Sequence, residues 1–319
     1  MALINGPSTQ VFMALKWQEG KPSFHIREDS QSTLMTESAI GYPLFYRATA
    51  DSKRFCLGHT AMTQEGTSYK ICLEKPKIGR KCQKCSNADA RYAANLHHSH
   101  TKNVNEVPQE FRNHMEQPNY LYLATFADGT IKIGTTTEKR KERRLREQGA
   151  LWATIIAKTL DGYTVRTLED LVTEELSIQQ SVTTKKKIAG LLRPADRTEV
   201  RKELKRVSGA VEALIQKVDY LDCELLGMKW ENDALENSIW ENVHSYPWDL
   251  TNGPHAVKVI DVIGRIGALS PVNSSDVFIA DLDALSETIE SVVKLSGTRL
   301  KDTIAAVSGS SVITKEIEL

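Results

Sequence analysis

The sequence predicts an α+β protein built around a three-stranded sheet with flanking helices. Two apolar runs, NYLYLATFA and TIKIGTT, surround the Asp128-Gly129 pair, which is a strong hairpin signal. A third run, LWATIIAKTL, follows a basic helical segment and predicts the third strand. A cysteine-rich segment precedes this sheet, and strand-like runs near both chain ends predict β-rich terminal segments.

The composition fits an ordinary globular protein. Of the 319 residues, 40% are hydrophobic and 26% are charged, and a chain of this length can bury a core without disulfides. The formal net charge is +0, but residues 132–146 hold seven Lys or Arg against two Glu. This basic segment indicates either a local face for a polyanion or a solvated charged helix.

The sequence favours a cytoplasmic protein that contacts no membrane. There is no run of about 18 apolar residues, the length that a membrane-spanning helix needs. The first residues, MALINGPSTQ, lack the basic start and apolar run of a secretory signal. We therefore expect reduced thiols.

The pattern divides the chain into five expected parts, beginning with a β-rich N-terminal segment. There, residues 10–20 and 21–28 are two strand-like runs around a turn, and residues 38–50 hold another strand candidate. The five parts are a β-rich segment (1–55), a cysteine-rich zinc-binding segment (56–118), the central module (119–195), a helical segment (196–248) and a small β-rich domain (249–319).

Four of the five cysteines lie close together in the sequence and predict a structural zinc site. The ligands are expected to be Cys56, Cys72, Cys82 and Cys85. The last two form a C-x-x-C pair, and four thiolates complete a tetrahedral zinc site with no open position for water. Alternatively, Cys56 and Cys72 are small buried core residues and the pair is incidental.

Histidines close to these cysteines give a further alternative. His59, His97, His98 and His100 could join the zinc site, but the last three lack the i, i+4 spacing of ligands on one helix face. Alternatively, His97, His98 and His100 belong to a polar helix end or loop and bind no metal. The fifth cysteine, Cys223, is expected to be a small buried residue.

Helices are expected after the second and third strands of the module. Thr137 precedes EKRKERRLREQ as an N-cap should, and Gly149 ends this helix. After the third strand and an Asp161-Gly162 turn, VRTLEDLVTEELSI predicts an amphipathic helix. The order is therefore strand, strand, helix, strand, helix.

These residues carry a resemblance to known families. YLYLATF, KIG, the arginine-bearing helix, the tripeptide QGA (148–150) and the upstream cysteines resemble the family called domain of unknown function 2797. The module also resembles the GIY-YIG nuclease superfamily, whose core is a three-stranded sheet with flanking helices. The likeness covers roughly residues 50–200. It implies a metal-dependent nuclease that hydrolyses phosphodiester bonds in DNA or, as the less favoured substrate, RNA.

The resemblance assigns roles to particular residues. Tyr122 falls on the tyrosine of the first motif and Gly134 on the glycine of the second. Arg144 matches the helix arginine that holds the scissile phosphate, and Glu169 matches the glutamate that binds a divalent ion, Mg or Mn. Asp170 and Glu174 are neighbouring alternatives to this glutamate.

One position departs from the superfamily pattern. Lys132 stands where the second tyrosine is expected, so activation of water would fall to Tyr122 or Tyr120. The basic residues around it form the predicted nucleic-acid-binding set: Lys132, Lys139, Arg140, Arg143 and Arg146.

Beyond the module, Thr198 is the expected N-cap of a long helix with a hydrophobic stripe from Val200 to Leu221. Strands are expected in residues 255–270, 276–285 and 310–319, with a helix at 286–295, and we expect this domain to pair with the N-terminal hairpins. Two main functions remain open for the whole chain. One is a metal-dependent nuclease, and the other is a catalytically inactive nucleic-acid-binding protein that keeps the nuclease fold. A third is a protein-interaction module that uses the long helix.

Overall fold

The computed structural model describes residues 10–28, 33–48, 55–64, 66–76, 79–218, 221–272 and 274–286. Over this part of the chain the fold is mixed α+β, as the sequence predicts. It divides into two compact units. Unit 1 comprises residues 1–58, 71–82 and 241–319, and unit 2 comprises residues 59–70 and 83–240. No helix in the described ranges is long and apolar enough to cross a membrane.

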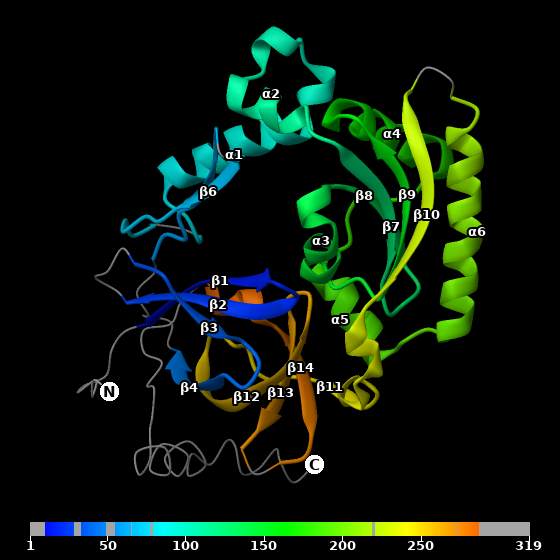
Figure 1. The fold of residues 1–319 in the computed structure, drawn as a ribbon. Coiled ribbons are helices and arrows are strands. Elements are labelled where there is room, and N and C mark those ends of the chain that lie inside the picture. The colour runs from blue at the N-terminus through cyan, green and yellow to red at the C-terminus, as the bar shows by residue number, and fades with distance from the viewer. Residues whose placement is uncertain are drawn as a thin grey trace. The chain divides into compact units, whose positions relative to one another are not determined.

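Unit 1 is built from two sheets that share one core. The first has the order β1-β2-β3 and the second the order β11-β14-β13-β12-β4 (Figure 1). The strands are β1 (Gln10–Gln18), β2 (Lys21–Glu28), β3 (Met35–Ser38), β4 (Pro43–Ala48), β11 (Val243–Ser245), β12 (Gly253–Ile263), β13 (Ile266–Pro271) and β14 (Val277–Asp281). Phe12, Phe24 and Tyr42 meet edge to face at the centre of the core, with ring centroids 5.1–5.7 Å apart.

The predicted N-terminal hairpin and the predicted pairing of the two terminal segments are both confirmed. β1 and β2 pair antiparallel around Glu19 and Gly20, both with positive φ. β4 pairs antiparallel with β12, so the N-terminal and C-terminal segments join in one sheet. The predicted strand at 255–270 is in fact a hairpin of β12 and β13 that turns at Gly264. The expected strand at 310–319 and the expected helix, apart from Ser286, lie outside the described residues.

Unit 2 contains an antiparallel sheet of four strands in the order β10-β9-β7-β8. These are β7 (Asn119–Thr125), β8 (Ile131–Thr137), β9 (Trp152–Thr159) and β10 (Cys223–Glu231). The first three are the predicted strands. The expectation of a three-stranded sheet was wrong, because β10 pairs with β9 and adds an edge strand.

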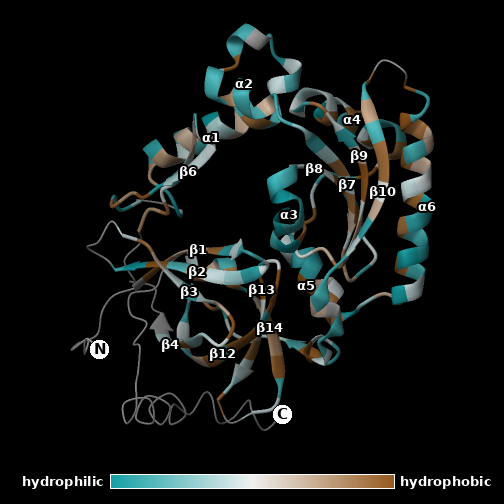
Figure 2. Cartoon of the chain, in the orientation of Figure 1, coloured by the Kyte–Doolittle hydropathy of each residue, from teal (hydrophilic) through white to brown (hydrophobic). Residues whose placement is uncertain are grey.

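Helices cover both faces of this sheet. α3 (Lys141–Glu147) packs Leu145 against the face that carries Tyr120 and Tyr122. α4 (Gly162–Leu176) and α6 (Arg197–Ile215) lie on the opposite face (Figure 1). α3 is almost entirely hydrophilic along its length (Figure 2), so only a narrow side of it enters the core. The predicted order of strands and helices is confirmed.

The helix starts differ from the expected caps. A 3-10 turn, η3 (Glu138–Arg140), comes before α3, and Thr137 makes no side-chain capping bond there. Asp196 rather than Thr198 caps α6, because its carboxylate accepts from two backbone N–H groups. Asp161 caps α4, because its carboxylate accepts from the Thr164 backbone N–H, so the predicted turn is itself the helix start.

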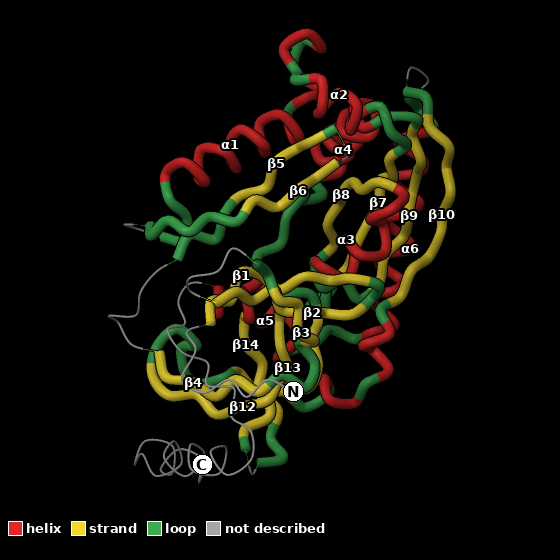
Figure 3. The backbone as a smooth tube through the Cα atoms, turned by 60° about the vertical axis from the view of Figure 1, so that its left-hand side comes forward, coloured by secondary structure: helices red, strands yellow, loops and turns green. Residues whose placement is uncertain are grey.

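The remaining elements of unit 2 are short. β5 (His59–Thr63) and β6 (Gly66–Lys70) form a hairpin that lies beside α1 (Gln83–His97), as Figure 3 shows. α2 (Gln109–Met115) follows α1, and α5 (Thr184–Leu192) precedes α6. η1 (Ser99–Thr101) contacts α4 and so ties the end of α1 to the sheet unit.

Candidate functional site

Tyr122 lies at the centre of the first candidate site, on β7. Its side chain is fully buried, and its cross-strand partner on β8 is Gly134. A Cβ atom at Gly134 would lie 2.4 Å from the Tyr122 hydroxyl oxygen. Glycine at this position therefore lets the tyrosine ring lie across the neighbouring strand.

Arg144 and Gln148, from α3 and the residue after it, reach the Tyr122 phenol. The phenol donates to Gln148 Oε1 at 3.4 Å and is also hydrogen-bonded with Arg144. Burial raises the pKa of Tyr122, an effect that Arg144 and Gln148 partly oppose. Tyr122 is therefore a neutral phenol near pH 7. The Gln148 Nε2 amide is buried and has no hydrogen-bond partner among the described residues, so it can donate to a ligand.

Glu169 is the acidic group of this site. It lies on α4, is only 4% exposed, and its charge acts on both Tyr122 and Lys132. Arg166, one turn earlier, donates from Nη1 to Glu169 Oε2 at 2.7 Å. The sequence left the choice of carboxylate open. Asp170 instead bonds His100 and Gln180 at 2.8 Å each, and Glu174 is exposed.

Lys132 also belongs to the site. It is 6% exposed, and its ammonium lies 5.8 Å from the centre of the Tyr122 ring. Burial, followed by the positive charge of Arg144, lowers the pKa of Lys132 to about 8, although Glu169 opposes the shift. This lysine can thus change protonation state close to neutral pH.

Sequence reasoning missed several groups that adjoin these residues. Lys187, on α5, donates to the Gln148 backbone carbonyl at 2.7 Å, and its charge acts on Lys132. Partial burial and the charges of Arg166 and Arg144 lower the pKa of His97 to about 4, so this histidine is neutral. Arg166 was also missed, although it precedes Glu169 by three residues in VRTLEDLVTEELSI, and this spacing on a helix is a signal for an ion pair.

Most of the predicted nucleic-acid-binding residues outside this cluster have protein partners. Arg140 and Arg143 both pair with Glu147, at 3.5 and 3.4 Å. Arg146 pairs with Asp233 at 2.5 Å and lies over the Trp230 ring. Lys139 is exposed. The basic helix is therefore largely neutralised along its outer side, and the unusual charge density lies around Glu169.

Tyr120, the other tyrosine considered for activating water, is also committed to a partner. Its phenol donates to Glu138, and the Lys141 ammonium lies 5.2 Å from the centre of its ring. Lys141 in turn bonds Glu138 at 2.7 Å. Tyr120 is thus fixed at the start of α3.

The second candidate site is the group of four cysteines, whose sulfur atoms all lie within 4.8 Å of one another. Cys56 precedes β5 and Cys72 follows β6, so the hairpin brings them together. Cys82 directly precedes α1, and Cys85 is in its first turn. Together they could hold a metal ion.

The sulfur geometry fits a tetrahedral thiolate site. Sulfurs bound to one zinc at about 2.3 Å lie about 3.8 Å from one another. The Cys72 and Cys82 sulfurs are 3.8 Å apart, and neither cysteine is part of a disulfide. The Cys82 backbone N–H donates to Cys56 Sγ at 3.2 Å, and His59 Nδ1 lies 3.3 Å from Cys85 Sγ. Such contacts orient and stabilise thiolates.

The histidines that were considered as further zinc ligands are not part of the cysteine group. The metal-binding group found within the described residues contains the cysteines alone. His59 contacts a cysteine sulfur, and His100 bonds Asp170. Cys223 is partly buried at the start of β10, and burial raises the pKa of its thiol.

Fold and sites together define a mixed α+β protein with a four-cysteine cluster able to hold a metal ion. The model of the family described as "Protein of unknown function (DUF2797)" matches residues 49–262, about two thirds of the chain, so the protein belongs to this family. The predicted relationship to this one family is confirmed. No curated protein and no solved structure matches the chain.

Proposed function

We propose that unit 2 is a GIY-YIG-like nuclease module that hydrolyses phosphodiester bonds, in DNA in preference to RNA. The observation that carries the proposal is the environment of Tyr122. Its hydroxyl faces Gly134, is hydrogen-bonded with Arg144, and lies within the field of Glu169. These four residues come from four different elements and are the four that the superfamily resemblance selects.

The side chains suit a phosphate ligand. Arg144 offers a planar fork of donors that matches two phosphate oxygens, and Lys132, Arg166 and Lys187 add positive charge nearby. The unpartnered Gln148 amide adds a neutral donor. Tyr122, with its raised pKa, is suited to orient Arg144 and Gln148 by hydrogen bonds rather than to accept a proton.

Glu169 would hold the catalytic Mg or Mn ion, with phosphate oxygens and water as the other ligands. A bound divalent ion supplies polarisation of the phosphoryl oxygen and stabilisation of the leaving group. Lys132 is then the group whose pKa, about 8, best suits removal of a proton from water. We therefore expect the cleavage rate to rise with pH through about 8.

A second function is favoured by one contact. Arg166 already donates to Glu169 Oε2, so this carboxylate is compensated without a metal ion. In a catalytically inactive nucleic-acid-binding protein, the same cations would bind phosphate and the glutamate would only hold Arg166 in place. The two functions differ in whether Glu169 is needed for turnover or only for structure.

We also propose that the cysteine cluster holds a structural zinc ion. Four sulfur donors that lie within 4.8 Å of one another can complete a tetrahedral zinc site, which leaves no position for a catalytic water. Reduced thiols of this kind are maintained in the cytoplasm, which we propose as the location of the protein.

The test is incubation of the full-length protein with plasmid, single-stranded DNA and RNA, with and without Mg²⁺ or Mn²⁺. Cleavage that needs the metal, and that is lost in Glu169→Gln, supports the nuclease. Glu174→Gln, which changes an exposed carboxylate on the same helix, is the matched control and should leave the rate unchanged.

Binding is measured in parallel by fluorescence anisotropy at several salt concentrations. Salt-dependent binding without cleavage, retained in Glu169→Gln, would establish the inactive binding protein instead. Neither binding nor cleavage of any of the three substrates would overturn both functions.

A further inference from the structure

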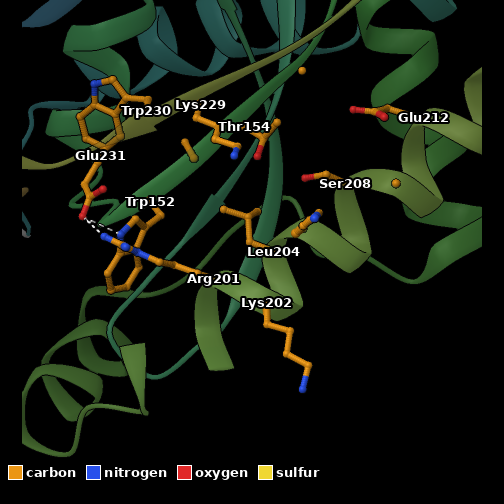
Figure 4. A pocket seen from close by; sticks show the side chains of 14 residues that line it. Trp152, Thr154, Arg201, Lys202, Leu204, Ser208, Glu212, Lys229, Trp230 and Glu231 are labelled. Carbon is orange, nitrogen blue, oxygen red and sulfur yellow. Dashed lines mark hydrogen bonds and ion pairs between the residues drawn. The ribbon is translucent and has the colours of Figure 1, made fainter. Parts of the chain in front are cut away.

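A cavity of about 870 Å³ lies in unit 2 on the sheet face opposite Tyr122, between β9, β10 and α6. Its volume falls in the range of small-molecule sites. Figure 4 shows Thr154 and Lys229 extending from the strands, and Ser208 and Glu212 extending from the helix, into the space between them. The cavity is therefore separate from the proposed nuclease site.

The local sequence explains why α6 does not pack tightly against β9 and β10 at this cavity. The pairing of β9 and β10 shifts between Leu225 and Met228, and Gly227 at this bulge has a φ of 61°. On α6, Ser208 and Gly209 are small residues facing the same region. A Cβ added at Gly209 would meet nothing within 4 Å. A bulge opposite small side chains leaves space.

Ser208 is a polar residue at a core position. The buried stripe of α6 runs through Val200, Leu204, Ser208, Val211 and Ile215. Ser208 is 6% exposed, and its hydroxyl has no hydrogen-bond partner among the described residues. Buried hydroxyls normally find a partner. This one lines the cavity, where a ligand can supply the partner.

Four basic and two acidic side chains line the cavity, so its lining carries an excess of positive charge that is not fully paired. Arg201, Glu231 and Trp152 satisfy one another, since Glu231 accepts from both the guanidinium and the indole N–H. Lys202 lines the cavity but pairs, at 3.6 Å, with Glu199, which does not. Lys205 and Lys229 are exposed and form no ion pair within the described part of the chain.

We propose that this cavity binds a small organic phosphate. Lysine ammonium groups at the opening, on α6 and β10, would hold the phosphate, for which lysine acts as a point charge. The organic body would occupy the interior beside Leu204 and Trp152 and give a polar group to Ser208. Inorganic phosphate alone is far smaller than the cavity. A carboxylate is less favoured, because Arg201, the arginine suited to pair with one, is already bound to Glu231.

The test is calorimetric titration of the full-length protein with AMP, glucose 6-phosphate, adenosine, inorganic phosphate and citrate. At least one of the two organic phosphates should bind, and both adenosine and inorganic phosphate should bind about tenfold more weakly or worse. Lys205→Gln with Lys229→Gln should weaken binding about tenfold or more. The matched control, Lys185→Gln with Lys217→Gln, changes two exposed lysines outside the cavity and should not.

Further variants fix the interior of the site. Ser208→Ala should weaken binding several-fold, and Ser208→Leu should block it by filling the space. Glu169→Gln should bind as the wild type does, which separates this site from the proposed nuclease. Three results would each overturn the proposal: no binding of either organic phosphate, tighter binding of citrate, or unchanged affinity in the Lys205 and Lys229 double variant.

Discussion

Lys132→Met is the substitution whose effect on stability follows most directly from the structure. Lys132 is buried beside Arg144 and Tyr122, and its pKa is lowered from 10.5 to about 8. Below pH 8 the lysine is protonated in the folded and the unfolded chain. Between pH 8 and 10.5 the folded protein releases this proton while the unfolded chain keeps it. The free energy of unfolding of the wild type should therefore rise with pH across this window.

The magnitude comes from the size of the shift. A displacement of about 2.5 pH units at about 1.4 kcal/mol each corresponds to about 3.5 kcal/mol in full, of which about 3 kcal/mol is gained by pH 10.5, where half of the unfolded chains have lost the proton. Methionine has a similar length and no charge, so Lys132→Met removes this increment. The variant should be more stable than the wild type at pH 7, and the advantage should shrink by about 3 kcal/mol by pH 10.5.

The assay is denaturant unfolding at intervals from pH 7 to 10.5, with the difference between variant and wild type plotted against pH. Other groups that titrate in this range cancel in the difference. Lys185→Met, at an exposed lysine, should follow the wild type at every pH. A difference curve for Lys132→Met that stays flat would refute the reasoning, because it would mean that the ammonium is not desolvated by the fold.

Three further outcomes are expected. Gly134→Ala should destabilise the protein by about 1–3 kcal/mol in thermal or denaturant unfolding, because its Cβ collides with the Tyr122 hydroxyl, whereas Gly209→Ala, in open space on a helix, should be neutral or stabilising. Equal effects would contradict this. Cys82→Ser should lose bound zinc, measured by elemental analysis of the purified protein, and retained zinc would disprove the assignment of the ligands. Asp196→Ala should cost about 1 kcal/mol of stability through loss of the α6 cap, and no change on unfolding would refute that role.

Local patterns in the sequence predicted much of unit 2. The strands on either side of Asp128-Gly129 formed the expected hairpin, because turn chemistry and alternation act over a few residues. The helix that follows ends before Gly149, whose φ of 73° suits glycine. The cysteine spacing likewise predicted a group of four, since a short hairpin brings the first two together.

The fourth strand was missed for a physical reason. β10, CELLGMKWE, is an edge strand whose charged residues are exposed, and its bulge at Gly227 breaks the alternation on which strand prediction depends. Pairing of β10 with β9 is a long-range contact that the local pattern does not encode. In addition, the strong helical pattern of α6, which lies between β9 and β10 in the sequence, led to the prediction of a helical segment over residues 196–248.

The choice between Glu169 and Glu174 could have been made from the sequence alone. Glu169 is four residues after Val165 and three before Val172, so it shares the buried stripe of α4, whereas Glu174 does not. Helical spacing therefore favours Glu169 without a structure. The approach of Lys187 could not be anticipated, because it is one of three consecutive lysines, and only the packing of α5 selects it.

The central claim is that Arg144 acts with Tyr122 and Glu169 on a phosphodiester. Its most direct test is the single-turnover cleavage rate of Arg144→Ala beside Arg143→Ala, on whichever of plasmid, single-stranded DNA or RNA the wild type cuts. Arg143 is one residue away, exposed, and paired with Glu147, so it carries the same charge without facing Tyr122. We expect a loss of about 100-fold or more for Arg144→Ala and a rate within about twofold of wild type for Arg143→Ala. Equal rates for the two variants, or no cleavage by the wild type, would contradict it.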